Sequence, residues 1–196
     1  MDVFLSAARA FAAQVRDLPA DLSGPGLGDW DLRALVGHTS RSLVTVLTYL
    51  PQRVEEVAVD SAASYFALLS ASGVTRGPDV SARGVAAGAA LGADPAAYVD
   101  DLLARVTAAL ADVDGDPVIT TAAGGMRLGD YLPTRTFELV VHGLDIAAAT
   151  GASWTPPADA LSSAVSVAGE TAVLTGSGVD LLRLATGRSS ATISVV

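Results

Sequence analysis

Apolar residues recur at helical spacing through most of this chain, and glycine, proline or a capping carboxylate bounds each run. Between residues 2 and 18 most apolar side chains are three or four positions apart, which places them on one face of a helix. The same periodicity returns further along, with an interruption at Gly92 to Pro95. The periodic segments are residues 2–18, 30–50, 61–72, 79–112 and 130–150. This pattern predicts an all-α protein.

Local signals predict where helices start and where the chain turns. Asp29 and Asp130 precede two of the periodic segments and are expected to be their N-caps. Residues 118–121 and 126–128 are rich in strand formers and flank Ala-Ala-Gly-Gly, so they predict a small hairpin that turns at Gly124-Gly125.

The segment after Gly151 predicts a short extension. Its signals indicate helices at 158–174 and 178–186, followed by a Ser/Thr/Val-rich tail that suits one strand. We therefore expect two parts, a bundle over 1–151 and a C-terminal extension over 152–196 packed on it. The first part is predicted to be an up-and-down four-helix bundle with a β-hairpin insertion, an architecture that builds metal sites from inward side chains of facing helices.

Composition excludes several kinds of chemistry. The chain has no cysteine, so disulfides, thiolate metal sites and a cysteine nucleophile are absent, which is compatible with a reducing compartment. All 12 basic residues are arginine, so no lysine can form a Schiff base. The net charge of −9 argues against a nucleic-acid partner.

The chain shows no targeting or membrane signal. The N-terminus lacks a basic segment followed by a long apolar run, and no apolar stretch reaches the roughly 18 residues of a membrane span. We expect a soluble cytoplasmic protein without a membrane partner, either a monomer or a homodimer.

The only two histidines, His38 and His142, both fall in predicted helices. Glu138 precedes His142 by four residues, so the two side chains leave one helix face about 40° apart around its axis. If a second helix supplies His38, these residues make a three-ligand divalent-metal site with an open coordination position.

Two residues on the same predicted helix bear on this site. Asp145, one turn after His142, is expected to orient that imidazole. Arg135, one turn before Glu138, either pairs with Glu138 or holds an anionic substrate. The alternative is structural: an ordinary ion network along the helix, with His38 a hydrogen-bonded core residue. The tyrosines are interpreted as core edges, with Tyr65 and Tyr131 the two to follow.

Two motifs resemble those of a known family. Residues 30–38, Trp-Asp-Leu-Arg-Ala-Leu-Val-Gly-His, resemble the W-x-x-x-x-L-v-x-H opening of the mycothiol-dependent maleylpyruvate isomerase family, which belongs to the DinB-like metal-binding helical bundles. Residues 135–145 resemble its second motif, R-x-x-E-x-x-x-H-g-x-D. The motifs occur in the right order, and the match covers most of residues 1–150.

The resemblance implies a site and a reaction. His38, Glu138 and His142 match the family's three metal ligands, usually for zinc, and the open position receives mycothiol, the low-molecular-weight thiol of actinobacteria. It therefore implies a metal-dependent, mycothiol-utilising S-transferase or isomerase acting on a small electrophile. Only about 45 residues follow Gly151, so the family's longer C-terminal domain and its anion-binding groups are not matched.

Two other functions stay open. The first is a non-enzymatic DinB-like protein that binds metal or a small ligand. The second is a bundle without metal that holds a hydrophobic ligand in its core.

Overall fold

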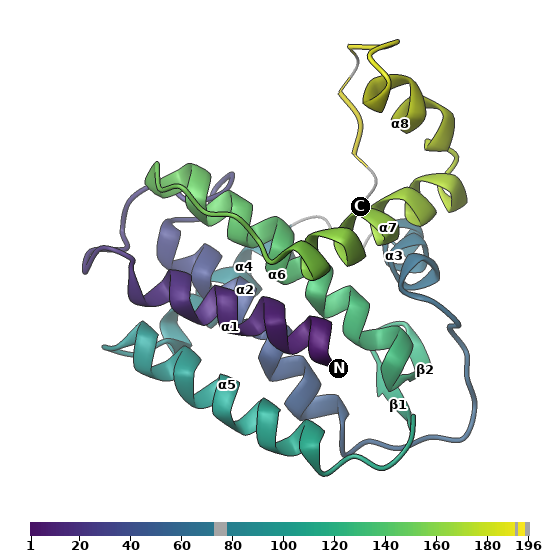
Figure 1. Ribbon diagram of the computed structural model, residues 1–196. Coiled ribbons are helices and arrows are strands. Elements are labelled where there is room, and N and C mark those ends of the chain that lie inside the picture. Colours follow the sequence, from purple (N-terminus) through teal and green to yellow (C-terminus); the bar gives the residue numbers. More distant parts are fainter. Residues whose placement is uncertain (73–77, 191, 195–196) are drawn as a thin grey trace.

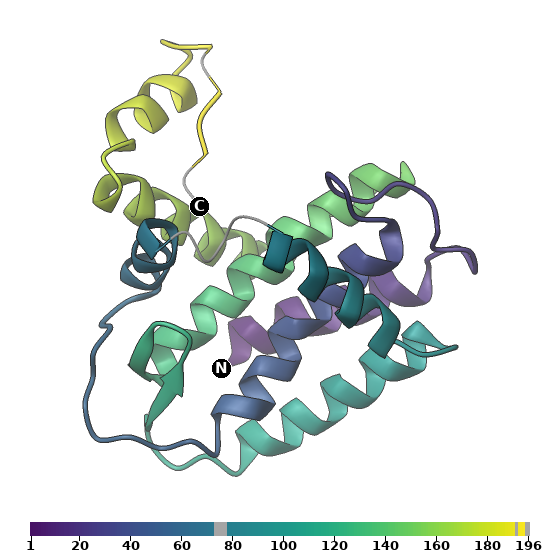
Figure 2. The same ribbon diagram turned by 180° about the vertical axis from the view of Figure 1, so that it is seen from behind.

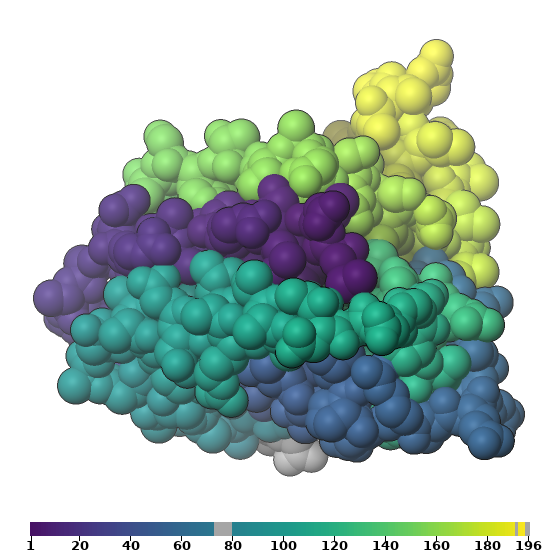
Figure 3. Space-filling model, turned by 60° about the horizontal axis from the view of Figure 1, so that its bottom comes forward, coloured from purple at the N-terminus to yellow at the C-terminus, as the bar shows by residue number. Residues whose placement is uncertain are grey.

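Four helices form a ring around the core in the computed structural model, which describes residues 1–72, 78–190 and 192–194 (Figure 1). Each helix packs against the next in the order α1, α5, α2 and α6, and α6 closes the ring against α1. Figure 3 shows α1 lying between α5 and α6 on one face. Their bounds are α1 (Asp2–Arg16), α2 (Leu32–Tyr49), α5 (Pro95–Ala111) and α6 (Leu128–Thr150). The predicted all-α, DinB-like fold is confirmed.

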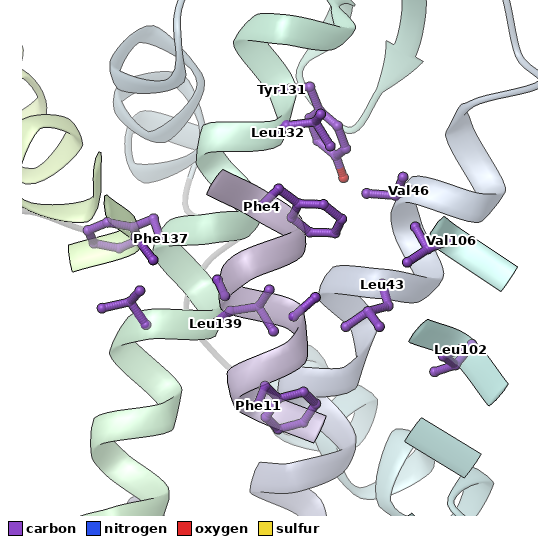
Figure 4. Close-up of a cluster of buried hydrophobic side chains, with 14 of the residues drawn as sticks. Phe4, Phe11, Leu43, Val46, Leu102, Val106, Tyr131, Leu132, Phe137 and Leu139 are labelled. Atoms are coloured by element: carbon purple, nitrogen blue, oxygen red, sulfur yellow. The ribbon is translucent and has the colours of Figure 1, made fainter. Parts of the chain in front are cut away.

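The apolar faces of these four helices meet in one core (Figure 4). Full burial of one such side chain contributes about 1.5–3 kcal/mol to stability relative to exposure. The apolar face that helical periodicity gives each of the four helices therefore favours packing them around a common core. Representative core residues, each at most 3% exposed, are Phe4, Phe11, Leu43, Val46, Leu102, Val106 and Leu139.

Three further helices cover this ring. α3 (Ala62–Ser72) and α7 (Ala158–Leu174) pack against α6 and each other, while α4 (Pro78–Ala90) packs against α2. The α2–α4 approach is close because of glycine: a Cβ on Gly37 would lie 2.2 Å from the backbone nitrogen of Gly88. Glycine at this position therefore brings α4 directly over the side of α2.

The last helix, α8 (Gly178–Ala185), contacts α7 and projects away from the ring (Figures 1 and 2). It has no buried residue. Neither α8 nor any other described helix is long and apolar enough to cross a membrane.

The predicted hairpin exists, but its turn was misplaced. Strands β1 (Val118–Thr121) and β2 (Gly124–Arg127) pair antiparallel, so Gly124 and Gly125 lie within β2. The two glycines are held in β2 because residues 54–59 run close beside this strand. The backbone N–H groups of residues 58 and 59 both donate to the Gly125 carbonyl. A Cβ on Gly125 would lie 2.1 Å from the carbonyl oxygen of Glu56.

Both predicted N-caps were wrong. α2 is capped by Asp31, whose Oδ1 accepts from the backbone N–H of Ala34 (2.7 Å), because an antiparallel bridge between Pro25 and Asp31 holds the preceding residues outside the helix. α6 begins directly at the end of β2, and Asp116, distant in sequence, accepts from the Gly129 N–H (2.7 Å). Asp130 therefore lies inside the first turn of α6.

The predicted C-terminal strand was also wrong over residues 187–190 and 192–194, which form none. A strand needs a neighbouring strand edge to bond with. The hairpin lies on the far side of α7 from this tail in both ribbon views, so no edge is available (Figures 1 and 2).

Candidate metal centre

His38 lies on the side of α2 that meets α6, and Trp30 holds it there. The Trp30 and His38 ring centroids are 4.6 Å apart. Trp30 is fixed in turn by α4, since its Nε1 donates to the Ser81 carbonyl (3.1 Å). Gly84 makes room for the indole, because a Cβ there would lie 2.3 Å from Cε2 of the ring. Trp30 therefore links α4 to His38.

Glu138 and His142 meet His38 across the contact between α2 and α6. The His142 Nε2 lies 3.1 Å from the Glu138 Oε2. The His38 and His142 rings are 4.9 Å apart and nearly perpendicular, at 86°. One ligand atom from each residue lies within 4.8 Å of the other two. The structure thus brings His38 to the pair that the four-residue spacing singled out.

The second ring nitrogen of His142 is bonded to Asp145. The Asp145 Oδ2 lies 2.9 Å from His142 Nδ1. A carboxylate at this nitrogen fixes the ring orientation and directs the other nitrogen, Nε2, toward Glu138, an arrangement typical of metal-bound histidine.

The cluster carries one exchangeable proton near neutral pH. Burial lowers the pKa of His38 to about 4, so its ring is neutral. Burial by itself raises the pKa of Glu138, but the hydrogen bond from His142 and nearby positive charges outweigh it and lower that pKa to about 2. Burial opposes protonation of His142, yet its hydrogen bonds to Asp145 and Glu138 raise its pKa to about 9.

These residues fit a divalent cation. Neutral imidazole and ionised carboxylate are the donors that zinc takes in three-ligand sites. Ligand atoms around a tetrahedral zinc are about 3.4 Å apart, close to the separation of His142 Nε2 and Glu138 Oε2. Among the described residues the buried Nδ1 of His38 has no hydrogen-bond partner, which is costly unless an ion or water meets it.

Arg135 does not form the predicted pair with Glu138. No carboxylate of the described residues lies within ion-pair distance of its guanidinium. Its Nε donates to the Thr134 Oγ1 (2.9 Å), and its Cζ lies 5.5 Å from the ring centroid of Tyr65 and 5.1 Å from that of Tyr131. The ion network along α6 therefore links Glu138, His142 and Asp145 and leaves Arg135 outside.

A separate cavity of about 530 Å³ lies at the C-terminal end of α6. Gln14 of α1 and Asp17, the residue directly after that helix, line it together with Thr150 and Trp154. None of the three clustered ligand residues lines this cavity, so it is distinct from the candidate metal centre.

Fold and site together define a class of protein: a DinB-like helical bundle with two histidines and a glutamate clustered between α2 and α6. Residues 4–147 match the family model described as the mycothiol maleylpyruvate isomerase N-terminal domain. The chain belongs to this family, which supports a mycothiol-related role, and the matched range contains all three clustered residues. Searches among curated proteins and among solved structures found no match.

Proposed function

We propose that this protein is a divalent-metal enzyme, with zinc as the metal, that uses mycothiol in S-transfer to, or isomerisation of, a small electrophile. The observation that carries the proposal is the convergence of His38, Glu138 and His142 in a member of a mycothiol-associated family. A cytoplasmic location and a monomeric or homodimeric state belong to the same proposal.

In this proposal His38, Glu138 and His142 hold the cation. When bound, a divalent cation would lower the pKa of a thiol at the open position, so that thiolate is available at neutral pH. Asp145 holds a proton on Nδ1 of His142, so Nε2 would be available as a ligand once its own proton is lost. Trp30 covers one face of His38 and limits water access from that side.

Metal analysis with variants tests the site. We expect purified protein to bind one zinc ion per chain, and His38→Ala, Glu138→Ala and His142→Ala each to lose it. Glu170→Ala is a matched control, since this exposed carboxylate on α7 accepts a hydrogen bond from Ser166 and from no other described side chain. Undiminished zinc binding in all three cluster variants would refute the metal centre.

Thiol dependence tests the reaction. We expect the zinc-loaded protein to accelerate the consumption of maleylpyruvate or another small electrophile above the uncatalysed rate only when mycothiol is present, and Glu138→Ala to abolish that acceleration. If the zinc-loaded protein neither binds mycothiol nor supports turnover, the non-enzymatic metal- or small-ligand-binding function replaces this one.

A further inference from the structure

Arg135 is a buried cation without an anion. The residue is 8% exposed, and its guanidinium packs beside the rings of Tyr65 and Tyr131, which also contact each other with centroids 6.1 Å apart. The hydrogen bond from its Nε goes to a neutral hydroxyl, that of Thr134. Buried charges are normally paired because an unpaired one loses several kcal/mol of hydration. A buried guanidinium without a counter-ion is therefore expected to bind an anion.

The carboxylate of Glu138 does not neutralise the charge of Arg135. Glu138 is one turn further along α6, but its Oε2 is engaged with His142 (3.1 Å), and no ion pair joins it to Arg135. A second arginine, Arg41 on α2, also acts electrostatically on His38 and Tyr65 and forms no ion pair with a described residue. With 21 acidic residues against 12 basic ones, unpaired arginines beside the cluster are not explained by a shortage of carboxylates.

Two tyrosine hydroxyls near Arg135 are further hydrogen-bond donors. The buried Oη of Tyr131 makes no hydrogen bond with a described residue and points from α6 toward α2 (Figure 4). The Thr45 hydroxyl is close enough to Tyr131 to lower its pKa slightly, but it donates to the Arg41 carbonyl (2.9 Å), and no hydrogen bond of normal geometry joins Thr45 to Tyr131. Burial raises the pKa of both Tyr131 and Tyr65, so both phenols stay protonated as donors.

This group of donors adjoins the metal cluster. Arg135, Glu138 and His142 are spaced three and four residues apart, so they share one face of α6. The charge of Arg135 helps to lower the pKa of Glu138, which shows that the two groups are electrostatically close. A small molecule paired with Arg135 would therefore have its remaining atoms near the candidate metal position.

We propose that Arg135, assisted by Arg41 and the hydroxyls of Tyr65 and Tyr131, is a subsite for a carboxylate carried by a molecule that reacts at the His38–Glu138–His142 cluster. The inference rests on the proposed function. A guanidinium fork matches a planar carboxylate through two parallel hydrogen bonds, which a single neutral group does not reproduce. The carboxylate belongs either to the electrophile or to the thiol.

Two matched thiols test the subsite. Cobalt-substituted protein is titrated with 3-mercaptopropionate and with its neutral amide, and binding is followed by the sulfur-to-cobalt absorption band. We expect the acid to bind about tenfold tighter than the amide, the effect of one charge-assisted pair. In Arg135→Gln the acid should lose this advantage while the amide binds as before, and Arg135→Lys should restore part of it.

Arg127→Gln is the charge-matched control, because it removes one exposed positive charge at the start of α6 and should keep the preference. Equal affinities of wild-type protein for acid and amide, both in this thiol pair and in the crotonate pair described next, overturn the subsite even if Arg135→Gln fails to fold. A preference that persists in Arg135→Gln overturns it as well.

Metal-free protein separates the sources of the carboxylate. Crotonate and crotonamide carry no thiol, and we follow their binding by changes in amide chemical shifts. Selective crotonate binding that Arg135→Gln removes assigns the carboxylate to the electrophile, whereas a preference seen only with the mercapto acid assigns it to the thiol. If the protein binds no cobalt, the metal proposal fails, and crotonate binding then decides the subsite alone: without it the subsite fails too.

Discussion

The Asp145 Oδ2 lies 2.9 Å from the Nδ1 of His142, on the side of the ring opposite the Nε2 that faces Glu138. This single contact fixes which nitrogen of His142 is available to a cation, and it contributes to the raised pKa of the ring. Asp145 is thus a positioning residue for the candidate metal centre.

Removing the charge of Asp145 should weaken the metal centre while the fold is kept. We expect Asp145→Asn to reduce zinc affinity about 10–100-fold, because the ring loses its orienting carboxylate and part of its basicity. Competition with a chromophoric chelator measures the affinity, and circular dichroism checks the helix content. Asp101→Asn, which alters only an exposed pair with Arg105, should leave the affinity unchanged. An unaltered affinity in Asp145→Asn would contradict the positioning role.

Metal binding should release about one proton per ion at pH 7.5. With its pKa near 9, His142 is almost fully protonated in the metal-free protein, whereas His38 is already neutral and Glu138 already ionised. Two histidines of ordinary pKa would together release only about 0.2 proton. Calorimetry in buffers of different ionisation enthalpy gives the number. A value near 0.2 would show that His142 is not protonated in the metal-free state.

The stability of the metal-free protein should pass through a maximum near pH 6.5. The folded-state pKa of His142 is raised to about 9 from 6.5, so its contribution is present below pH 6.5 and is lost as the pH rises to 9. The pKa of His38 is lowered to about 4, so the unfolded chain gains a proton first and stability falls as the pH drops from 6.5 to 4.

Urea unfolding across pH 4–9 measures this dependence. His142→Gln should flatten the alkaline side of the stability curve, and His38→Gln should flatten the acid side. The pKa of Glu138 is lowered from 4.5 to about 2, so its stabilising contribution is lost as the unfolded chain takes up a proton below about pH 5.5, and the effect of His38 is read between about pH 5.5 and 6.5. If either variant keeps the wild-type slope on its side, the assigned pKa shift is wrong.

Adding one methyl group beneath Trp30 should disturb both stability and the candidate site. A Cβ on Gly84 would overlap the indole, so Gly84→Ala should lower the free energy of unfolding by about 1–3 kcal/mol. Zinc affinity should fall as well, because Trp30 supports His38. Gly169→Ala on α7 is the matched control, since its Cβ meets open space and should stabilise by about 0.4–1 kcal/mol. Similar unfolding free energies for the two variants would contradict the packing account.

The sequence predicted those features of the fold that depend on residues within the same helix or turn, and missed those that depend on contacts between distant segments. The helix segments followed from periodicity, because apolar spacing acts within each helix. The caps did not follow: α6 uses Asp116, which precedes Gly129 by 13 residues, and the Gly124-Gly125 pair is held in a strand by the chain at 54–59. Tyr131 precedes Arg135 by four residues on the same helix, but nothing nearby in the sequence indicated that Tyr65 of α3 would join it and that Arg135 would be buried.

The sequence by itself determined that Glu138 and His142 share a helix face, since a four-residue spacing on a helix allows no other outcome. It also determined the ring of helices through the apolar stripes. Only the tertiary structure decided that His38 joins the pair, because that contact depends on α2 packing against α6 and on α4 holding Trp30 in place. It likewise decided that Arg135 pairs with no carboxylate of the described residues, since the side chains around a buried group depend on how the helices pack.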